Sequence, residues 1–298
     1  MRIATSQYSQ TMNTALQTAN AGLTQVMSQM ASGSRILKPS DDTIATVRLA
    51  RLSREEAALD QYRSNITALT TRLQNNETTL TSMQEDLLMV RDLMVWAADG
   101  ASTKDDMKAM ATSLEALRDS LYFSANTRNA EGQWMFSGTA SNVQTLEVDQ
   151  AGVYSFGAGV DTQTQQVAVG DGVTIAANVS LREYPLDVFL NGLQAAIKAF
   201  SDGSYAGANP AGAQIVATDE LLNFLGGQIA QQGGRQNIIK TMDDNHAAVS
   251  LSNKEATLAL GKVDYAEAAI RLNSYELAVQ ATQKAYARVS NLSLFDVL

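Results

Sequence analysis

The 298-residue sequence contains no cysteine and a single histidine, His246. Without cysteine there is no disulfide scaffold, no thiolate zinc site, no iron–sulfur cluster and no cysteine nucleophile. One histidine is also too few for a metal site built from several imidazoles. Most metal and nucleophile chemistry is thereby excluded, so we expect neither an enzyme nor a bound cofactor.

Basic charge and long apolar runs are scarce as well. The 22 Lys and Arg against 31 Asp and Glu give a formal net charge of −9, the wrong sign for a nucleic-acid-binding surface. No run of about 18 apolar residues could cross a membrane, and the N-terminal residues lack the apolar core of a cleaved secretory signal. These signals alone would place the chain in the cytosol, although some export routes use none of them.

Proline and glycine are distributed unevenly. Ten of the 19 glycines lie between Gly132 and Gly207, whereas residues 41–99 contain neither glycine nor proline and residues 235–298 contain only Gly261. Stretches without helix breakers favour long helices. Short alternating apolar runs occupy 141–183, and Gly170-Asp171-Gly172 is typical of a hairpin turn between the last two runs. The chain is therefore predicted to be mainly α-helical, with a small inserted β-domain.

Apolar side chains recur every seven residues within the glycine-free stretch. They stand at Leu52, Leu59, Ile66, Leu73, Leu80, Leu87 and Met94. A second row three residues on includes Asn76, which would fix the register of a helical seam. A helix over about 235–292 would span roughly 85 Å, longer than the ~50 Å diameter of a globule of this size. We therefore expect an elongated, coiled-coil-like rod.

The two ends of the chain carry similar rows, so we expect them to pack on each other. The N-terminal row is Met12, Leu16, Ala19, Leu23, Val26 and Met30. The C-terminal row is Met242, Val249, Ala256, Val263, Ile270 and Leu277.

Several polar motifs have a structural and a functional interpretation. Ser40 is predicted to cap the long helix, with Asp41 and Asp42 in its first turn, rather than to bind metal. The pairs Gly226-Gly227 and Gly233-Gly234 lack the context of a phosphate loop and are predicted to form a loop or a weakened turn. His246 is expected to be a satisfied interface residue. The row Arg48, Arg51 and Arg54 is either a solvated face or a site for an acidic patch of a neighbouring subunit.

Residues 3–34 contain no charged side chain. A solvent-facing helix normally carries Lys and Glu, whereas an uncharged polar face can be buried against other chains without the cost of burying charge. This segment is expected to be marginally stable alone and ordered on assembly.

Five segments resemble the flagellin superfamily. Residues 30–42 (MASGSRILKPSDD) are similar to its N-terminal signature, and residues 233–237 (GGRQN) and 265–268 (YAEA) to its C-terminal half. Residues 132–138 (GQWMFSG) and 287–298 (ARVSNLSLFDVL) resemble its hook-associated members, although Val297 stands where an aromatic residue is common. The resemblance covers about 1–138 and 184–298.

The resemblance implies three layers. Residues 1–39 and 265–298 would form a terminal core domain for assembly, 40–138 and 184–264 a helical rod domain, and 139–183 a small outer β-rich insert. The terminal core would be built from Met12, Leu16, Leu23, Val26, Met30, Ile270, Leu277, Val289, Leu292, Leu294 and Phe295.

The implied function is that of a structural adaptor that joins the flagellar hook to the filament. The protein would be extracellular, exported unfolded through the flagellar type III apparatus without a cleaved signal, and held beforehand by a cytosolic chaperone at its C-terminal segment. Its partners would be its own copies, a hook-associated protein on the hook side and flagellin on the filament side. Two alternatives stay open: a bulk filament flagellin, which copy number would distinguish, and a secreted coiled-coil binding protein.

Overall fold

The computed structural model describes residues 2–99, 102–204 and 210–295, with side chains placed for 7–99, 102–204 and 210–288. The chain divides into two compact units, one of Met1–Ala58 with Ala248–Leu298 and one of Leu59–Ala247. The described part of the chain is dominated by six helices with two small two-stranded sheets, which confirms the mainly α fold with a small β insertion. None of the described helices is long and apolar enough to cross a membrane.

The glycine-free stretch forms one helix, α2 (Thr43–Ala98). Within the 59–247 unit, the seven-residue row on α2 is buried from Leu59 to Met94, and so is most of the second row. Asn76, in the second row, is 1% exposed and donates its Nδ2 to the Ala177 carbonyl oxygen at 3.3 Å. The seam therefore contacts β-strand residues as well as other helices.

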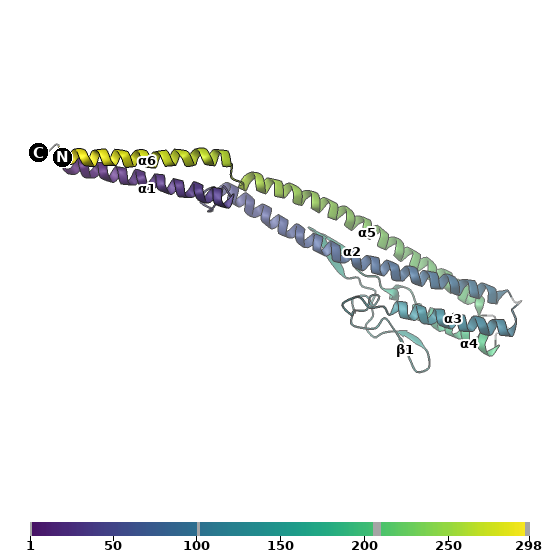
Figure 1. Ribbon diagram of the computed structural model, residues 1–298. Coiled ribbons are helices and arrows are strands. Elements are labelled where there is room, and N and C mark those ends of the chain that lie inside the picture. Colours follow the sequence, from purple (N-terminus) through teal and green to yellow (C-terminus); the bar gives the residue numbers. More distant parts are fainter. Residues whose placement is uncertain (1, 100–101, 205–209, 296–298) are drawn as a thin grey trace. The chain divides into compact units, whose positions relative to one another are not determined.

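The main core of the 59–247 unit lies among α2, α3 (Lys104–Ala125), α4 (Leu186–Asp202) and the first part of α5 (Ala211–Gly261). Helix α3 begins with a capping box, in which Thr103 and Asp106 each accept from the other's backbone N–H. Figure 1 shows α3 and α4 lying together. Phe136 and Phe200 are among the largest side chains fully enclosed in this core.

The predicted strands are present as two antiparallel hairpins. Strand β1 (Leu146–Val148) pairs with β2 (Tyr154–Phe156), and β3 (Gln166–Gly170) pairs with β4 (Val173–Ala176) across the expected Gly-Asp-Gly turn. The ends of the insert lie close together, because Asn178 Nδ2 donates to the Gly138 carbonyl oxygen at 2.7 Å.

The insert shares its apolar cores with the helices. Leu146 and Tyr154 belong to the main helical core, and Val169 and Ala177 form a second cluster with Ile66 of α2. Short alternating apolar runs indicate which side chains are buried but not which residues they pack against. The packing of the insert on the helices was therefore not predicted.

Of the two forms expected at the paired glycines, a loop or a weakened helical turn between two helices, the loop is wrong. Gly226-Gly227 and Gly233-Gly234 all lie inside α5, where a Cβ on any of them would meet nothing within 4 Å. Helical glycine costs about 1 kcal/mol relative to alanine. The buried row Leu221, Leu225, Gln228 and Gln232 continues past these positions, so tertiary packing outweighs the local propensity.

The expected continuous C-terminal helix is also wrong, because the chain leaves the helix at Lys262. Helix α5 ends at Gly261, and α6 (Tyr265–Phe295) starts after Asp264, whose Oδ1 accepts from the backbone N–H groups of Ala266 and Glu267. In the unit of Met1–Ala58 and Ala248–Leu298, α6 runs beside α1 (Arg2–Ser32), as Figure 1 shows.

Candidate functional site: the paired terminal helices

The α1–α6 pair has a thin apolar core. Its buried members are Val26, Val263 and Ala268, with Met30, Leu272 and Tyr275 partly buried beside them. Gly22 allows the two helices to approach, because a Cβ at this position would lie 2.6 Å from Cε1 of the Tyr275 ring. The helices are thus held together by few side chains and one close contact.

The predicted row on α1 faces α6, but most of it is incompletely covered. Val26 is buried, whereas Met12, Leu16, Leu23 and Met30 are half-buried. That this row is buried on assembly stays a prediction, since the pair of helices alone does not enclose it.

The polar face of α1 satisfies its own hydroxyl groups. Thr11, Thr14 and Thr18 each donate Oγ1 to the carbonyl oxygen four residues earlier, at 2.9 Å. With the hydroxyl hydrogens used in this way, threonine presents mainly its methyl group outward. These hydroxyl donors of α1 therefore need no hydrogen-bond acceptor from a partner, which suits burial of the threonine positions against another protein.

The predicted assembly positions Ile270 and Leu277 do not face α1 in the isolated chain. Ile270 is 69% and Leu277 59% exposed, and Ala268, Leu272 and Tyr275 face α1 instead. The seven-residue interval from α5 loses its phase because Val263 lies in the non-helical connection and Asp264 starts a new helix. The predicted residues Val289, Leu292, Leu294 and Phe295 lie outside the described side chains.

Arg35 connects the N-terminal and C-terminal segments where both leave their helices. Its guanidinium donates Nε at 3.3 Å and one Nη at 3.1 Å to the Leu260 carbonyl oxygen, and the same Nη lies 3.1 Å from Asp42 Oδ2. The Arg35 backbone N–H donates to the Gly261 carbonyl oxygen at 2.8 Å, and that of Val263 donates to Gly33 at 3.0 Å. Two segments that are far apart in sequence are thus joined by main-chain and side-chain bonds.

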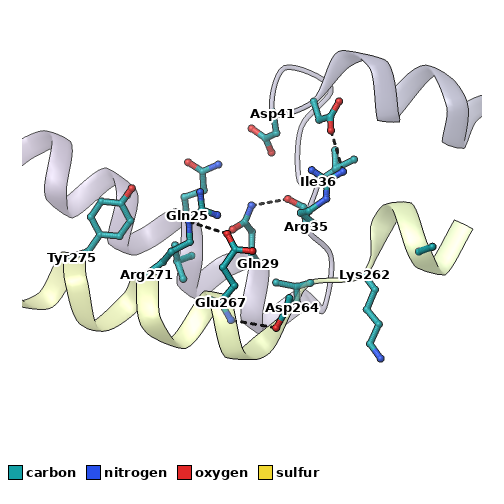
Figure 2. Close-up of a pocket in the computed structure, with 16 residues that line it drawn as sticks. Gln25, Gln29, Arg35, Ile36, Asp41, Lys262, Asp264, Glu267, Arg271 and Tyr275 are labelled. Carbon is teal, nitrogen blue, oxygen red and sulfur yellow. Dashed lines mark hydrogen bonds and ion pairs between the residues drawn. The ribbon is translucent and has the colours of Figure 1, made fainter.

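Figure 2 shows how further residues of the two signatures serve this junction. Buried Gln29 donates Nε2 to the Arg35 carbonyl oxygen at 2.6 Å, and the Tyr265 hydroxyl donates to the Met30 carbonyl oxygen at 3.2 Å. Arg271 faces Glu267 at 3.8 Å. Two of the segments that resemble the flagellin superfamily, residues 30–42 and 265–268, therefore meet in space.

Helix α2 is capped by Asp42 and not by the predicted Ser40. Asp42 Oδ1 accepts from the Ala45 backbone N–H at 2.9 Å, while Asp41 Oδ2 accepts from the N–H groups of Leu37 and Lys38 within the preceding turn. The Ala45 N–H, and then the Arg35 guanidinium, lower the pKa of the Asp42 carboxyl below its ordinary value. Asp42 therefore stays ionised at neutral pH, where it serves as both cap and ion-pair partner.

The cavity beside Arg35 has a volume of about 430 Å³ and is lined largely by polar and charged groups. In this cavity the charge of Arg35 is offset by Asp42, and the charge of Arg271 is offset by Glu267. In the described part of the chain, no group of three or more His, Asp or Glu could hold a metal ion. The arrangement is suited to holding segments together and not to chemistry on a substrate.

The remaining predicted residues occupy simpler surroundings. Ile66, Leu73, Leu80, Leu87 and Met94 are buried in the 59–247 unit, and Leu52 is half-buried in the other unit. The three side chains of the arginine row, Arg48, Arg51 and Arg54, are exposed.

His246 is a satisfied interface residue, as expected. Its Nε2 lies 2.8 Å from the Val169 carbonyl oxygen, and its ring stacks on Tyr62 with the centroids 5.7 Å apart. It fastens the β3–β4 hairpin to the helices.

Sequence reasoning missed the residues of the junction, namely Arg35, Gln29 and Tyr265. Arg35 and Tyr265 stand in recognised motifs, but their bonding partners lie more than 200 positions away. The sequence offered one signal for these residues: the motifs at 30–42 and 265–268 lie at the ends of helices, where backbone groups lack partners within the helix and must bond to other residues.

Comparisons with known proteins agree with the resemblance to the flagellin superfamily. A family model described as the bacterial flagellin N-terminal helical region matches residues 3–141. Flagellar hook-associated protein 3 of Escherichia coli is 27% identical over 288 residues, covering 90% of each chain. The protein of that name from Salmonella typhimurium is 26% identical over 319 residues, covering 100% of this chain and 99% of the relative.

A solved structure described as a flagellar hook-associated protein from Vibrio parahaemolyticus is 32% identical, with a TM-score of 0.68. The match covers 74% of this chain and 99% of the solved one. These relatives are structural flagellar proteins and not enzymes. The terminal signatures are in contact, and the match to the Vibrio parahaemolyticus protein extends over almost the whole of that protein's solved chain. The chain therefore belongs to the flagellin family, among its flagellar hook-associated proteins.

Proposed function

We propose that the protein is a structural subunit of the junction between flagellar hook and filament, assembled outside the cell through α1 and α6. The observation that carries the proposal is the α1–α6 pair itself. Its inner core is thin, and its surface is uncharged on α1 and apolar at Met27, Ile270 and Leu277. The similarity to proteins named flagellar hook-associated protein 3 supports this place in the flagellum.

The energetics favour folding coupled to assembly. Ordering a backbone costs roughly 1–2 kcal/mol per residue, and a fully buried apolar side chain contributes only about 1.5–3 kcal/mol. The few side chains buried among residues 7–32 and 265–288, the part of the pair with described side chains, cannot offset this cost over that length of helix. Neighbouring subunits would supply the missing contacts by covering the exposed rows.

The partners and the route follow from the same proposal. Copies of this chain and a hook-associated protein would lie on the hook side, and flagellin on the filament side. The chain would pass unfolded through the flagellar type III apparatus, with a cytosolic chaperone holding its C-terminal segment until export. Marginal terminal helices and the absence of disulfides support a protein that must cross a narrow channel unfolded.

Electron microscopy of cells that lack this protein tests the junction role. We expect intact hooks without filaments, flagellin released into the medium, and restored filaments when the chain is supplied from a plasmid. Normal filaments in the deletion strain would overturn the proposal. Counting copies per flagellum separates a junction from a filament, because a junction is a thin ring and a filament contains thousands of subunits.

A further inference from the structure

Helix α2 carries two exposed stripes that mix apolar and charged side chains. The basic stripe consists of Ile44, Val47, Arg48, Arg51 and Arg54. The acidic stripe consists of Glu85, Leu88, Met89, Asp92, Val95, Trp96 and Asp99. In each stripe the residues are three, four or seven positions apart, so each stripe occupies one face of the helix.

The apolar side chains of the two stripes are more exposed than would be favourable for a chain that has no binding partner. Ile44 is 68%, Val47 67% and Trp96 56% exposed. Single exposed apolar residues are common, but a row of them at helical spacing that includes an indole marks an interaction surface. Both stripes thus present apolar groups that a partner could cover.

The charges of the two stripes are opposite and available. The acidic stripe holds three carboxylates and no basic residue, whereas the basic stripe holds three guanidinium groups with only Glu55 among them. Arg48, Arg51, Glu85 and Asp92 make no ion pair within the part of the chain that the structure describes.

The two stripes also match in spacing. Positions 44, 47, 48, 51 and 54 of the basic stripe have counterparts at positions 85, 88, 89, 92 and 95 of the acidic stripe. Val47 corresponds to Leu88, and Arg51 at the centre of one stripe corresponds to Asp92 at the centre of the other. In this register Val47 meets Leu88 and the Arg51 guanidinium meets the Asp92 carboxylate. The other three positions place Ile44, Arg48 and Arg54 against Glu85, Met89 and Val95, respectively.

We infer that the basic stripe of one copy docks on the acidic stripe of a second copy of this chain. The inference rests on the proposed function, because it names the surfaces through which copies meet. The two stripes differ, so the contact is heterologous and leaves one free stripe of each kind on every pair. Repetition of such a contact generates a ring or a helical row.

Chemical crosslinking in intact flagella tests the contact, since the chain has no cysteine of its own. A chain with both Arg51→Cys and Asp92→Cys is expressed in the deletion strain, and isolated flagella are treated with a short flexible bismaleimide. We expect a ladder of linked multimers on a denaturing gel. Either single variant should stay monomeric, and so should Arg51→Cys combined with Asp60→Cys, because Asp60 is exposed but lies 32 positions, roughly 48 Å, from Asp92 along α2.

Charge reversal gives a second measurement that does not depend on exact register. Arg51→Glu and Asp92→Arg should each lower the amount of chain retained in flagella several-fold, and the two together should restore it. The control reversals Asp60→Arg and Lys108→Glu, both at exposed sites, should leave retention unchanged.

The outcomes separate this inference from the proposed function. Attached filaments with neither a ladder nor charge rescue would overturn the stripe contact and leave the junction role standing. A crosslinked product with the mass of another flagellar protein would assign the stripe to that partner instead and also overturn the inference. Absence of the chain from flagella would contradict the proposed function itself.

Discussion

The 59–247 unit and the α1–α6 pair both use rows of apolar side chains at helical spacing, but they bury them to different degrees. In the first, α2 packs with other helices and with the β3–β4 hairpin, so that Leu73, Leu80 and Leu87 are completely enclosed. In the second, two helices cover each other on one side only, and Met12, Leu16 and Leu23 stay half-exposed. Similar sequence patterns thus produce an enclosed core in one region and a partly exposed one in the other.

The largest expected effect comes from removing the insert, replacing 141–182 with a short Gly/Ser linker. The sequence alone would predict little harm to hook–filament joining. The structure predicts the opposite, because Leu146, Tyr154, Val169, Val179 and Leu181 would leave the two cores. At about 1.5–3 kcal/mol for each side chain, the loss is on the order of 10 kcal/mol, comparable with the whole stability of a domain.

Thermal denaturation followed by circular dichroism measures this loss. We expect the cooperative transition of the 59–247 unit to disappear. A transition that stays cooperative and within a few degrees of the parent would show that the hairpins contribute little to the core.

A charge within the α2 seam should have the next largest effect. Ile66 is 4% exposed and packs in the cluster that contains Leu69, Val169 and Ile239. Ile66→Asp would bury an unpaired carboxylate and lower the free energy of unfolding by about 3–5 kcal/mol. Denaturant titration checks the value, with Thr67→Asp as the matched control because Thr67 is exposed. Equal effects of the two substitutions would contradict the assigned seam.

The close contact between the terminal helices gives a smaller but more selective test. In Gly22→Ala the new methyl would overlap the Tyr275 ring and weaken α1–α6 pairing by about 1–3 kcal/mol. We expect several-fold fewer cells with attached filaments. Gly227→Ala is the control, since its methyl meets nothing within 4 Å and should stabilise α5 by up to about 1 kcal/mol. If more cells carried attached filaments in Gly22→Ala than in the parent, the close contact between Gly22 and Tyr275 would be contradicted.

The smallest expected effect concerns the cap of α2. Asp42→Ala should destabilise the start of this helix more than Ser40→Ala, because Asp42 accepts the Ala45 N–H. The pKa of Asp42 is lowered in the folded chain by that N–H and by Arg35, so its ionised form stabilises the fold above its unfolded pKa. This contribution is lost as the pH falls through the folded pKa. Melting curves of parent and variant should therefore differ most above about pH 5 and converge in strong acid.

The sequence was sufficient for α2 because its seven-residue row runs unbroken from Leu59 to Met94 in a stretch without glycine or proline. Periodicity of this kind depends only on local geometry. The hairpin across Gly170 to Gly172 was predictable for the same reason, since Gly172 adopts a φ of +68° that favours glycine in a turn.

The connection between α5 and α6 was not predictable, because it depends on partners distant in sequence. Arg35 binds the Leu260 carbonyl oxygen and the Val263 N–H binds Gly33, which together fix the chain outside a helix. A row of apolar residues counted through Val263 therefore does not identify the residues of α6 that face α1, which are Ala268, Leu272 and Tyr275. Long-range hydrogen bonds of this kind leave no periodic trace in the sequence.

Hydrogen exchange of the terminal segments tests the central claim most directly, namely that α1 and α6 become fully ordered only among neighbouring subunits. Amide exchange is measured by mass spectrometry in the purified monomer and in isolated flagella, with residues 59–97 of α2 as an internal reference. We predict that residues 1–34 and 265–298 exchange almost freely in the monomer while 59–97 is protected, and that the terminal segments become protected on assembly. Strong protection of the termini in the monomer would contradict coupled folding and assembly.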